Sequence, residues 1–127
     1  MEFRILDLFC GAGGFSHGID KHKNFKTVLC LDFDKNAINT FNKNIQSAKG
    51  IYGDITDAKV KTEVISLAKE LKVNMIIGGP PCQGFSLKGK QLGLKDPRNF
   101  LFLEYIDVVK EIKPEVFVIE NVKNLLS

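Results

Sequence analysis

The apolar residues of this chain fall into short runs that alternate with stretches of helical periodicity. Runs at 3–9, 27–33, 73–79 and 116–122 are typical of buried strands, and a short segment near 50–54 adds a fifth. Between them, apolar side chains recur three or four positions apart, which predicts amphipathic helices with one stripe facing a core. The stripes are Ala37, Ile38, Phe41 and Ile45, then Val60, Val64, Ala68 and Leu71, and then Leu101, Tyr105, Val109 and Ile112. This alternation predicts an α/β fold, a mostly parallel sheet with helices on both faces.

Composition and charge add little to this picture. The 127 residues suffice for one domain with a core, and 44% hydrophobic and 26% charged residues are ordinary values. A net charge of +3 is compatible with a nucleic-acid partner but too weak to indicate one. The three cysteines form no CxxC pair, so neither a disulfide framework nor a metal site is indicated. With neither a basic leader nor a long apolar run at the amino terminus, we expect a cytoplasmic protein without a membrane span.

The first strand is followed by a glycine-rich turn, 7-DLFCGAGGFSHG-18. Gly11, Gly13 and Gly14 allow a sharp turn and a close approach of a ligand to the backbone. The turn departs from GxGxxG because Ser16 stands where the third glycine would be. A glycine-rich connector without a ligand is therefore the alternative to a nucleotide site.

Carboxylates follow the second and third strands. Asp32 lies about as far beyond the glycine turn as a carboxylate that binds ribose hydroxyls, and Phe33 beside it could pack on an adenine ring. Asp34 is better placed to cap the following helix. In GDIT, Asp54 could accept the amino group of an adenine while the Ile55 backbone supplies a second partner, although a simple turn residue is the alternative.

The segment 78-GGPPCQGFSLKGKQLG-93 holds a cysteine at the end of the fourth run. Two prolines fix the backbone before Cys82, and glycines follow it. A thiol held there is better placed to be a nucleophile than to fill a core, as Cys30 does. Glu120 follows four apolar residues at the end of the last strand and is expensive to bury without a partner or a task. Together they suggest covalent catalysis with help from a carboxyl group, although a surface Glu is the alternative.

The ordered set of motifs closely resembles the DNA (cytosine-5) methyltransferases of bacterial restriction–modification systems. In order they are DLFCGAGGFS, LDFDKNA, GDIT, GGPPCQGFS, DPRNFLFLEYI and PEVFVIENVKNLL, and they cover essentially the whole chain. PPCQGFS followed by ENV is highly specific, whereas the glycine turn alone is not. The resemblance implies the Rossmann-like fold of S-adenosylmethionine-dependent methyltransferases.

The same resemblance implies roles for individual residues. Cys82 would add to carbon 6 of a cytosine flipped out of double-stranded DNA, and carbon 5 would then take the methyl group of S-adenosylmethionine. Glu120 would contact the cytosine ring, and Asn121 would help to hold the loop that carries Cys82. The cofactor would be held by Phe9, Gly11, Gly13, Asp32, Phe33, Asp54, Ile55, Pro81 and Leu101. The DNA would be contacted by Gln83, Ser86, Lys88 and Arg98, with the cations on phosphates.

Members of this family continue with further strands and a target-recognition region. We therefore expect residues 1–127 to form the amino-terminal portion of a catalytic domain, with the sheet incomplete at its carboxyl-terminal side and no target-recognition region. A carboxyl-terminal half on a separate chain could complete it. The alternatives are a tRNA cytosine-5 methyltransferase, an inactive fragment that needs its missing half and, outside the family, a NAD-binding domain.

Overall fold

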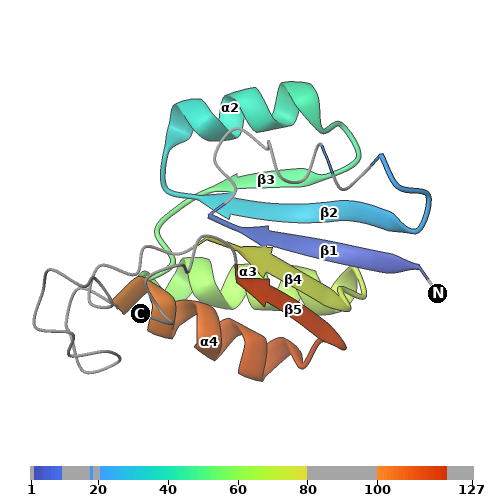
Figure 1. Cartoon of the computed structure of the whole chain (residues 1–127). Helices are drawn as coiled ribbons and strands as arrows, with labels where there is room; N and C mark the ends of the chain where they lie inside the picture. Colours follow the sequence, from blue (N-terminus) through green and yellow to red (C-terminus); the bar gives the residue numbers. More distant parts are fainter. Residues whose placement is uncertain (1, 10–17, 19–20, 80–99, 120–127) are drawn as a thin grey trace, which may run out of the picture.

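A computed structural model describes residues 2–9, 18, 21–79 and 100–119 of the chain. Strands and helices alternate along it, as the apolar pattern predicts (Figure 1). The elements are β1 (Phe3–Leu8), β2 (Phe25–Asp32), α2 (Lys35–Asn44), β3 (Lys49–Tyr52), α3 (Ala58–Glu70), β4 (Met75–Gly78), α4 (Phe100–Ile112) and β5 (Val116–Ile119). Each of the five expected strands is present; four have ends within a few residues of those predicted, and the last, expected at 116–122, is described as far as Ile119.

The five strands form one sheet in the order β3-β2-β1-β4-β5. All four pairings are parallel, which confirms the predicted type of sheet. The first strand is central and pairs with β2 on one side and with β4 on the other. Because all strands run the same way, their carboxyl ends meet at one edge, on which ligands of open α/β sheets bind.

Helices cover both faces of the sheet, also as predicted. On one face, α3 and α4 bury Val64, Ala68, Tyr105 and Val108 against a cluster that includes Ile76 of β4. On the opposite face, α2 packs on the sheet through a smaller cluster, whose buried members are Cys30, Ile38, Phe41 and Ile45. Alternation of side chains along β2 explains the split, since Cys30 faces α2 whereas its neighbours Leu29 and Leu31 face α3 and α4.

The helix that follows β2 begins where the sequence predicts. The Asp34 carboxylate accepts hydrogen bonds from the backbone nitrogens of Asn36 and Ala37, so Asp34 is the N-cap of α2. Asp57 caps α3 in the same manner through Lys59. Within the part of the chain that is described, no helix is long and apolar enough to cross a bilayer.

Candidate cofactor site

The chain turns sharply where β1 reaches the carboxyl edge of the sheet. Phe9 has a φ of 61°, in the left-handed region that non-glycine residues rarely occupy. Its backbone nitrogen donates a 2.8 Å hydrogen bond to the carbonyl oxygen of Leu31, which ties the turn to the end of β2. The positive φ is thus held by a neighbouring strand, and strain of this kind is concentrated at functional sites.

The end of β2 presents a buried carboxylate beside an exposed aromatic ring. Asp32 is 7% exposed, and its Oδ1 accepts a 2.9 Å hydrogen bond from the backbone nitrogen of Asp34. Its carbonyl oxygen accepts a 3.0 Å hydrogen bond from the nitrogen of Gly53, which fixes the end of β2 against the turn after β3. Phe33 is 63% exposed, the largest value among the exposed large hydrophobic residues of the described chain. A ring left in water beside a fixed carboxylate suits a planar ligand with hydroxyl groups.

The turn after β3 carries the second carboxylate. Asp54 Oδ1 accepts hydrogen bonds from the backbone nitrogen and the hydroxyl of Thr56, at 2.9 and 2.7 Å. These two bonds, the backbone one first, hold the pKa of Asp54 below its ordinary value. Asp54 is therefore ionised at neutral pH and acts as a hydrogen-bond acceptor. The neighbouring Ile55 is buried with its side chain in the core, which fixes the backbone of this turn.

These side chains line one hollow at the carboxyl edge of the sheet. Its walls are Phe9, Leu31, Asp32, Phe33, Gly53, Asp54, Ile55 and Leu101. Six of them were predicted as cofactor residues, and Leu101 comes from α4, almost fifty positions beyond Ile55. Leu31 and Gly53 were not predicted, although each is the neighbour of a predicted residue. Two carboxylates and one exposed ring are groups that would contact the hydroxyls, the amino group and the planar base of a nucleoside lying over this edge of the sheet.

The remaining predicted residues lie outside the described part of the chain. They are the cofactor residues Gly11, Gly13 and Pro81, the catalytic candidates Cys82, Glu120 and Asn121, and the DNA candidates Gln83, Ser86, Lys88 and Arg98. Their roles stay predictions. The structure does describe the two strands that lead toward Cys82 and Glu120. Gly78 ends β4 four positions before Cys82, and Ile119 ends β5 directly before Glu120.

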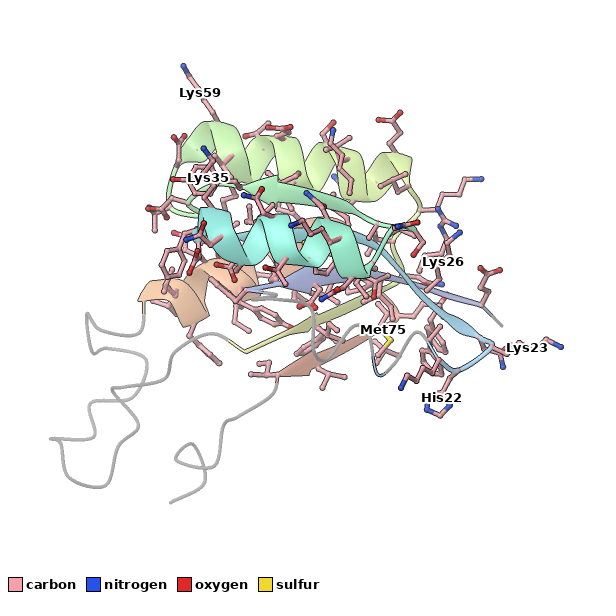
Figure 2. The ribbon with its side chains drawn as sticks, turned by 90° about the horizontal axis from the view of Figure 1, so that it is seen from above. His22, Lys23, Lys26, Lys35, Lys59 and Met75 are labelled. Atoms are coloured by element: carbon pink, nitrogen blue, oxygen red, sulfur yellow. The ribbon has the colours of Figure 1, made fainter. Side chains whose placement is uncertain are left out.

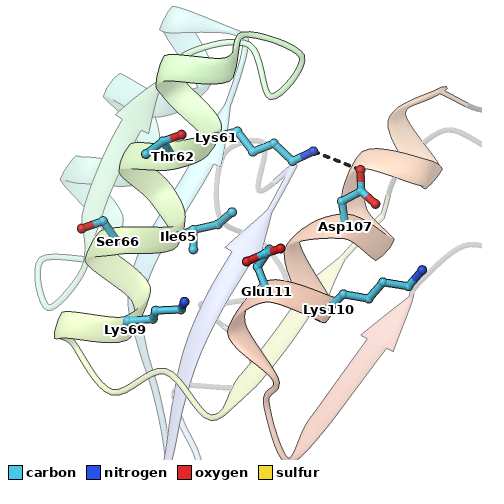
Figure 3. Close-up of a pocket in the computed structure, with 8 residues that line it drawn as sticks. All are labelled: Lys61, Thr62, Ile65, Ser66, Lys69, Asp107, Lys110 and Glu111. Carbon is cyan, nitrogen blue, oxygen red and sulfur yellow. Dashed lines mark hydrogen bonds and ion pairs between the residues drawn. The ribbon is translucent and has the colours of Figure 1, made fainter.

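A larger hollow lies between α3 and α4, away from these residues (Figure 3). Lys61 crosses it to form ion pairs with Glu104 Oε2 at 2.6 Å and with Asp107 Oδ2 at 3.1 Å. That oxygen of Glu104 is buried, and Lys61 is the group that compensates its charge. Burial lowers the pKa of Lys61, but hydrogen bonds to Glu104 and Asp107 outweigh it and raise the pKa above its ordinary value. The ion pairs of Lys61 with Glu104 and Asp107 hold α3 to α4. We therefore interpret this hollow as part of the packing between the two helices and not as a ligand site.

Charge does not single out one end of the molecule. Lys35 is the first residue of α2 and Lys59 is the second residue of α3. Both lie toward the same end of the sheet (Figure 2). His22, Lys23 and Lys26 lie at the opposite end, around the start of β2 (Figure 2). The lysines labelled in this view are therefore spread over both ends, and the hollow with its carboxylates, not the charge, marks the candidate site.

Comparison with known proteins gives consistent matches. A family model described as C-5 cytosine-specific DNA methylase matches residues 3–127. The type II methyltransferase M.AquIA of a Picosynechococcus species is 42% identical over 130 residues, which cover 100% of this chain and 51% of that protein. M.DdeI of Desulfomicrobium norvegicum is 44% identical over 123 residues, which cover 97% of this chain and 28% of that protein. The chain thus spans about half or less of these relatives.

Solved structures show the same fold. A prophage-encoded DNA modification methyltransferase of E. coli superposes with a TM-score of 0.76 at 30% identity, over 99% of this chain and 34% of that one. Spodoptera frugiperda DNMT2 superposes with a TM-score of 0.65 at 23% identity, over 97% of this chain and 37% of that one. The sheet and its covering helices are accordingly a Rossmann-like methyltransferase fold.

Proposed function

The chain belongs to the C-5 cytosine-specific DNA methylase family, and from this premise we propose that it is the cofactor-binding and catalytic part of a DNA (cytosine-5) methyltransferase. The observation that carries the proposal is the hollow at the carboxyl edge of the sheet. It gathers six residues from four separate segments that the family resemblance assigns to S-adenosylmethionine. Two of those residues, Asp32 and Asp54, are held in place by hydrogen bonds from the backbone.

The cofactor would lie across the ends of β1, β2 and β3. Asp32, whose Oδ1 accepts a hydrogen bond from the Asp34 backbone, would accept hydrogen bonds from the ribose hydroxyls. Phe33 would stack on the adenine, and Asp54 would accept its amino group while ionised. Phe9 and Leu101 would close the apolar wall. When bound, the cofactor supplies an electrophilic methyl group.

The reaction itself would be performed by Cys82 on the cytosine. Its thiolate adds to carbon 6, which makes carbon 5 nucleophilic enough to accept the methyl group. A base then removes the proton from carbon 5, and the bond between Cys82 and carbon 6 breaks to release 5-methylcytosine. Glu120 would stabilise the charge that develops on the ring during addition, and Asn121 would help to hold the loop of Cys82.

The substrate would be double-stranded DNA with the target cytosine turned out of the stack, since carbon 6 cannot be attacked within a duplex. Gln83, Ser86, Lys88 and Arg98 would contact it, the two cations mainly through phosphates. Because the chain spans half or less of its relatives, we propose that sequence-specific methylation needs a further carboxyl-terminal part with a target-recognition region. That part could belong to a separate chain.

The test is transfer of a tritiated methyl group from S-adenosylmethionine to genomic DNA or to tRNA. The chain is assayed alone and joined to the carboxyl-terminal part of the M.DdeI relative, each with a Cys82→Ala control. Label in 5-methylcytosine of DNA that disappears in the control is the expected result. Label in tRNA alone would refute DNA as the substrate, and no label in any arm would refute the catalytic assignment.

A further inference from the structure

A tyrosine of α4 is buried where two strands of the sheet reach their carboxyl ends. Tyr105 is 0% exposed, although its hydroxyl is polar. The hydroxyl lies 2.8 Å from the carbonyl oxygen of Val118 on β5 and donates a hydrogen bond to it. The carbonyl oxygen of Ile76 on β4 lies 3.4 Å from the same hydroxyl. The hydroxyl thus donates its one hydrogen to β5 and makes a longer, weaker contact with the backbone of β4, so a single side chain links the two neighbouring strands from the α4 side.

The ring of Tyr105 also fixes the last residue of β4. A Cβ atom at Gly78 would lie 2.7 Å from Tyr105 Cε2 and 2.8 Å from the carbonyl oxygen of Leu8. Any side chain at this position would push the strand away from the ring, from β1 or from both. Glycine at 78 is thus what allows α4, β1 and the end of β4 to meet in direct contact.

The strand β5 needs such support, because little of it is buried. Val116 is 39% exposed and Phe117 is 49% exposed, so the first half of this strand packs weakly. Its beginning is held by the carbonyl oxygen of Asn74, which accepts hydrogen bonds from Glu115 and Val116. Near the carboxyl end of β5, the Tyr105 hydroxyl donates a side-chain hydrogen bond to the carbonyl oxygen of Val118.

Both held strands lead toward the predicted catalytic residues. Gly78 precedes Cys82 by four positions, two of which are prolines with restricted backbone angles, and Val118 precedes Glu120 by two. We propose that Tyr105 is a positioning residue, whose hydroxyl aligns the ends of β4 and β5 and thereby sets the nucleophile and the glutamate relative to each other. This role rests on the proposed function, because it presumes that Cys82 and Glu120 act on one cytosine.

The test compares Tyr105→Phe, which removes only the hydroxyl, with Ile38→Val as a matched control. Ile38 is buried on the opposite face of the sheet under α2, so its truncation weakens the fold away from the strand ends. The first measurement is amide hydrogen exchange of the 127-residue chain. Tyr105→Phe should speed exchange at the ends of β4 and β5 and leave β2 and β3 unchanged, whereas Ile38→Val should not affect β4 and β5 selectively.

The second measurement is methyl transfer and covalent trapping on DNA that contains 5-fluorocytosine. It uses the chain joined to the carboxyl-terminal part of the M.DdeI relative. Misplacing a reacting group by a fraction of an ångström slows chemistry more than binding, so we expect kcat and the trapping rate to fall about tenfold with an unchanged KM for S-adenosylmethionine. Ile38→Val should keep both values near wild type.

The outcomes separate this role from the function on which it rests. Unchanged exchange at the ends of β4 and β5, or an unchanged trapping rate, would overturn the positioning role of Tyr105. A rise in the KM for S-adenosylmethionine as large as the fall in kcat would overturn it too, because it would show that the hydroxyl serves the cofactor site instead. If the wild-type protein trapped no DNA, the proposed function would fail, and selective exchange effects would then leave Tyr105 as a clamp of the sheet alone.

Discussion

Replacement of Phe33 by alanine should separate binding of the cofactor from stability of the fold. Phe33 is 63% exposed, so only about a third of its side chain is buried. Full burial of a phenylalanine contributes up to about 3 kcal/mol, and the partial burial here limits the loss of stability to about 1 kcal/mol. Stacking of a base on an aromatic ring is worth about 1–3 kcal/mol by alanine substitution. The dissociation constant for S-adenosylmethionine should therefore rise roughly fivefold to 150-fold.

The chain offers a matched control in Tyr52. It is a second exposed aromatic residue at the same edge of the sheet, 59% exposed at the end of β3, and it does not line the hollow. Tyr52→Ala should lower the melting temperature about as little as Phe33→Ala and leave the affinity for S-adenosylmethionine unchanged.

Titration calorimetry with S-adenosylmethionine gives the affinities, and scanning calorimetry gives the melting temperatures. Phe33→Trp, with a larger ring, should bind at least as tightly as wild type. The stacking argument is wrong if Phe33→Ala keeps its affinity within twofold of wild type. It is also wrong if both alanine variants lose affinity to the same extent.

Three further changes test other parts of the structure. Asp32→Ala should weaken binding of S-adenosylmethionine by at least about tenfold, since hydrogen bonds to a charged group are worth about 1.5–3 kcal/mol; calorimetry that shows no change would exclude a ribose contact. Gly78→Ala should lower the free energy of unfolding by about 1–3 kcal/mol in urea titrations, whereas Gly18→Ala, where a new Cβ meets nothing within 4 Å, should be nearly neutral. Equal effects of the two glycine changes would refute the close contact of β4 with α4. Because the pKa of Lys61 is raised above 10.5, the stability from its ion pairs is complete below that pH and is lost as the pH rises through the raised value. Wild type should lose more stability between about pH 10 and 12 than Lys61→Met, and parallel pH profiles would contradict this.

The fold could be predicted largely from the period of the apolar residues. Mostly apolar runs such as 3–9 indicated buried strands, and their alternation with helices indicated parallel pairing. Periodicity cannot show which strand is central, because that depends on contacts between segments about seventy residues apart, such as Ile5 with Met75. The family resemblance, not the pattern, supplied the narrower assignment to the Rossmann-like fold of S-adenosylmethionine-dependent methyltransferases.

The candidate site was predictable where chemistry shows in residue type. Asp32, Phe33 and Asp54 stand out at strand ends as acids or an aromatic beside a turn, and the structure brings them to one hollow. Tyr105 was read only as part of an apolar helix stripe, because a sequence does not show where a hydroxyl points. Lys61 was hidden for a similar reason, since its partner Asp107 lies 46 positions away on another helix.

The central place of β1 has a consequence for how the chain folds during synthesis. This strand leaves the ribosome before the other four strands of the sheet, yet one of its two pairing edges waits for β4, about seventy residues later. Until then an apolar strand with an open edge is exposed in the nascent chain, which is the kind of segment that pairs with other chains. Parallel pairing between such distant segments also closes slowly. The yield of folded protein should therefore depend more on how well residues 3–8 are protected until residue 78 has emerged than on the final stability of the sheet.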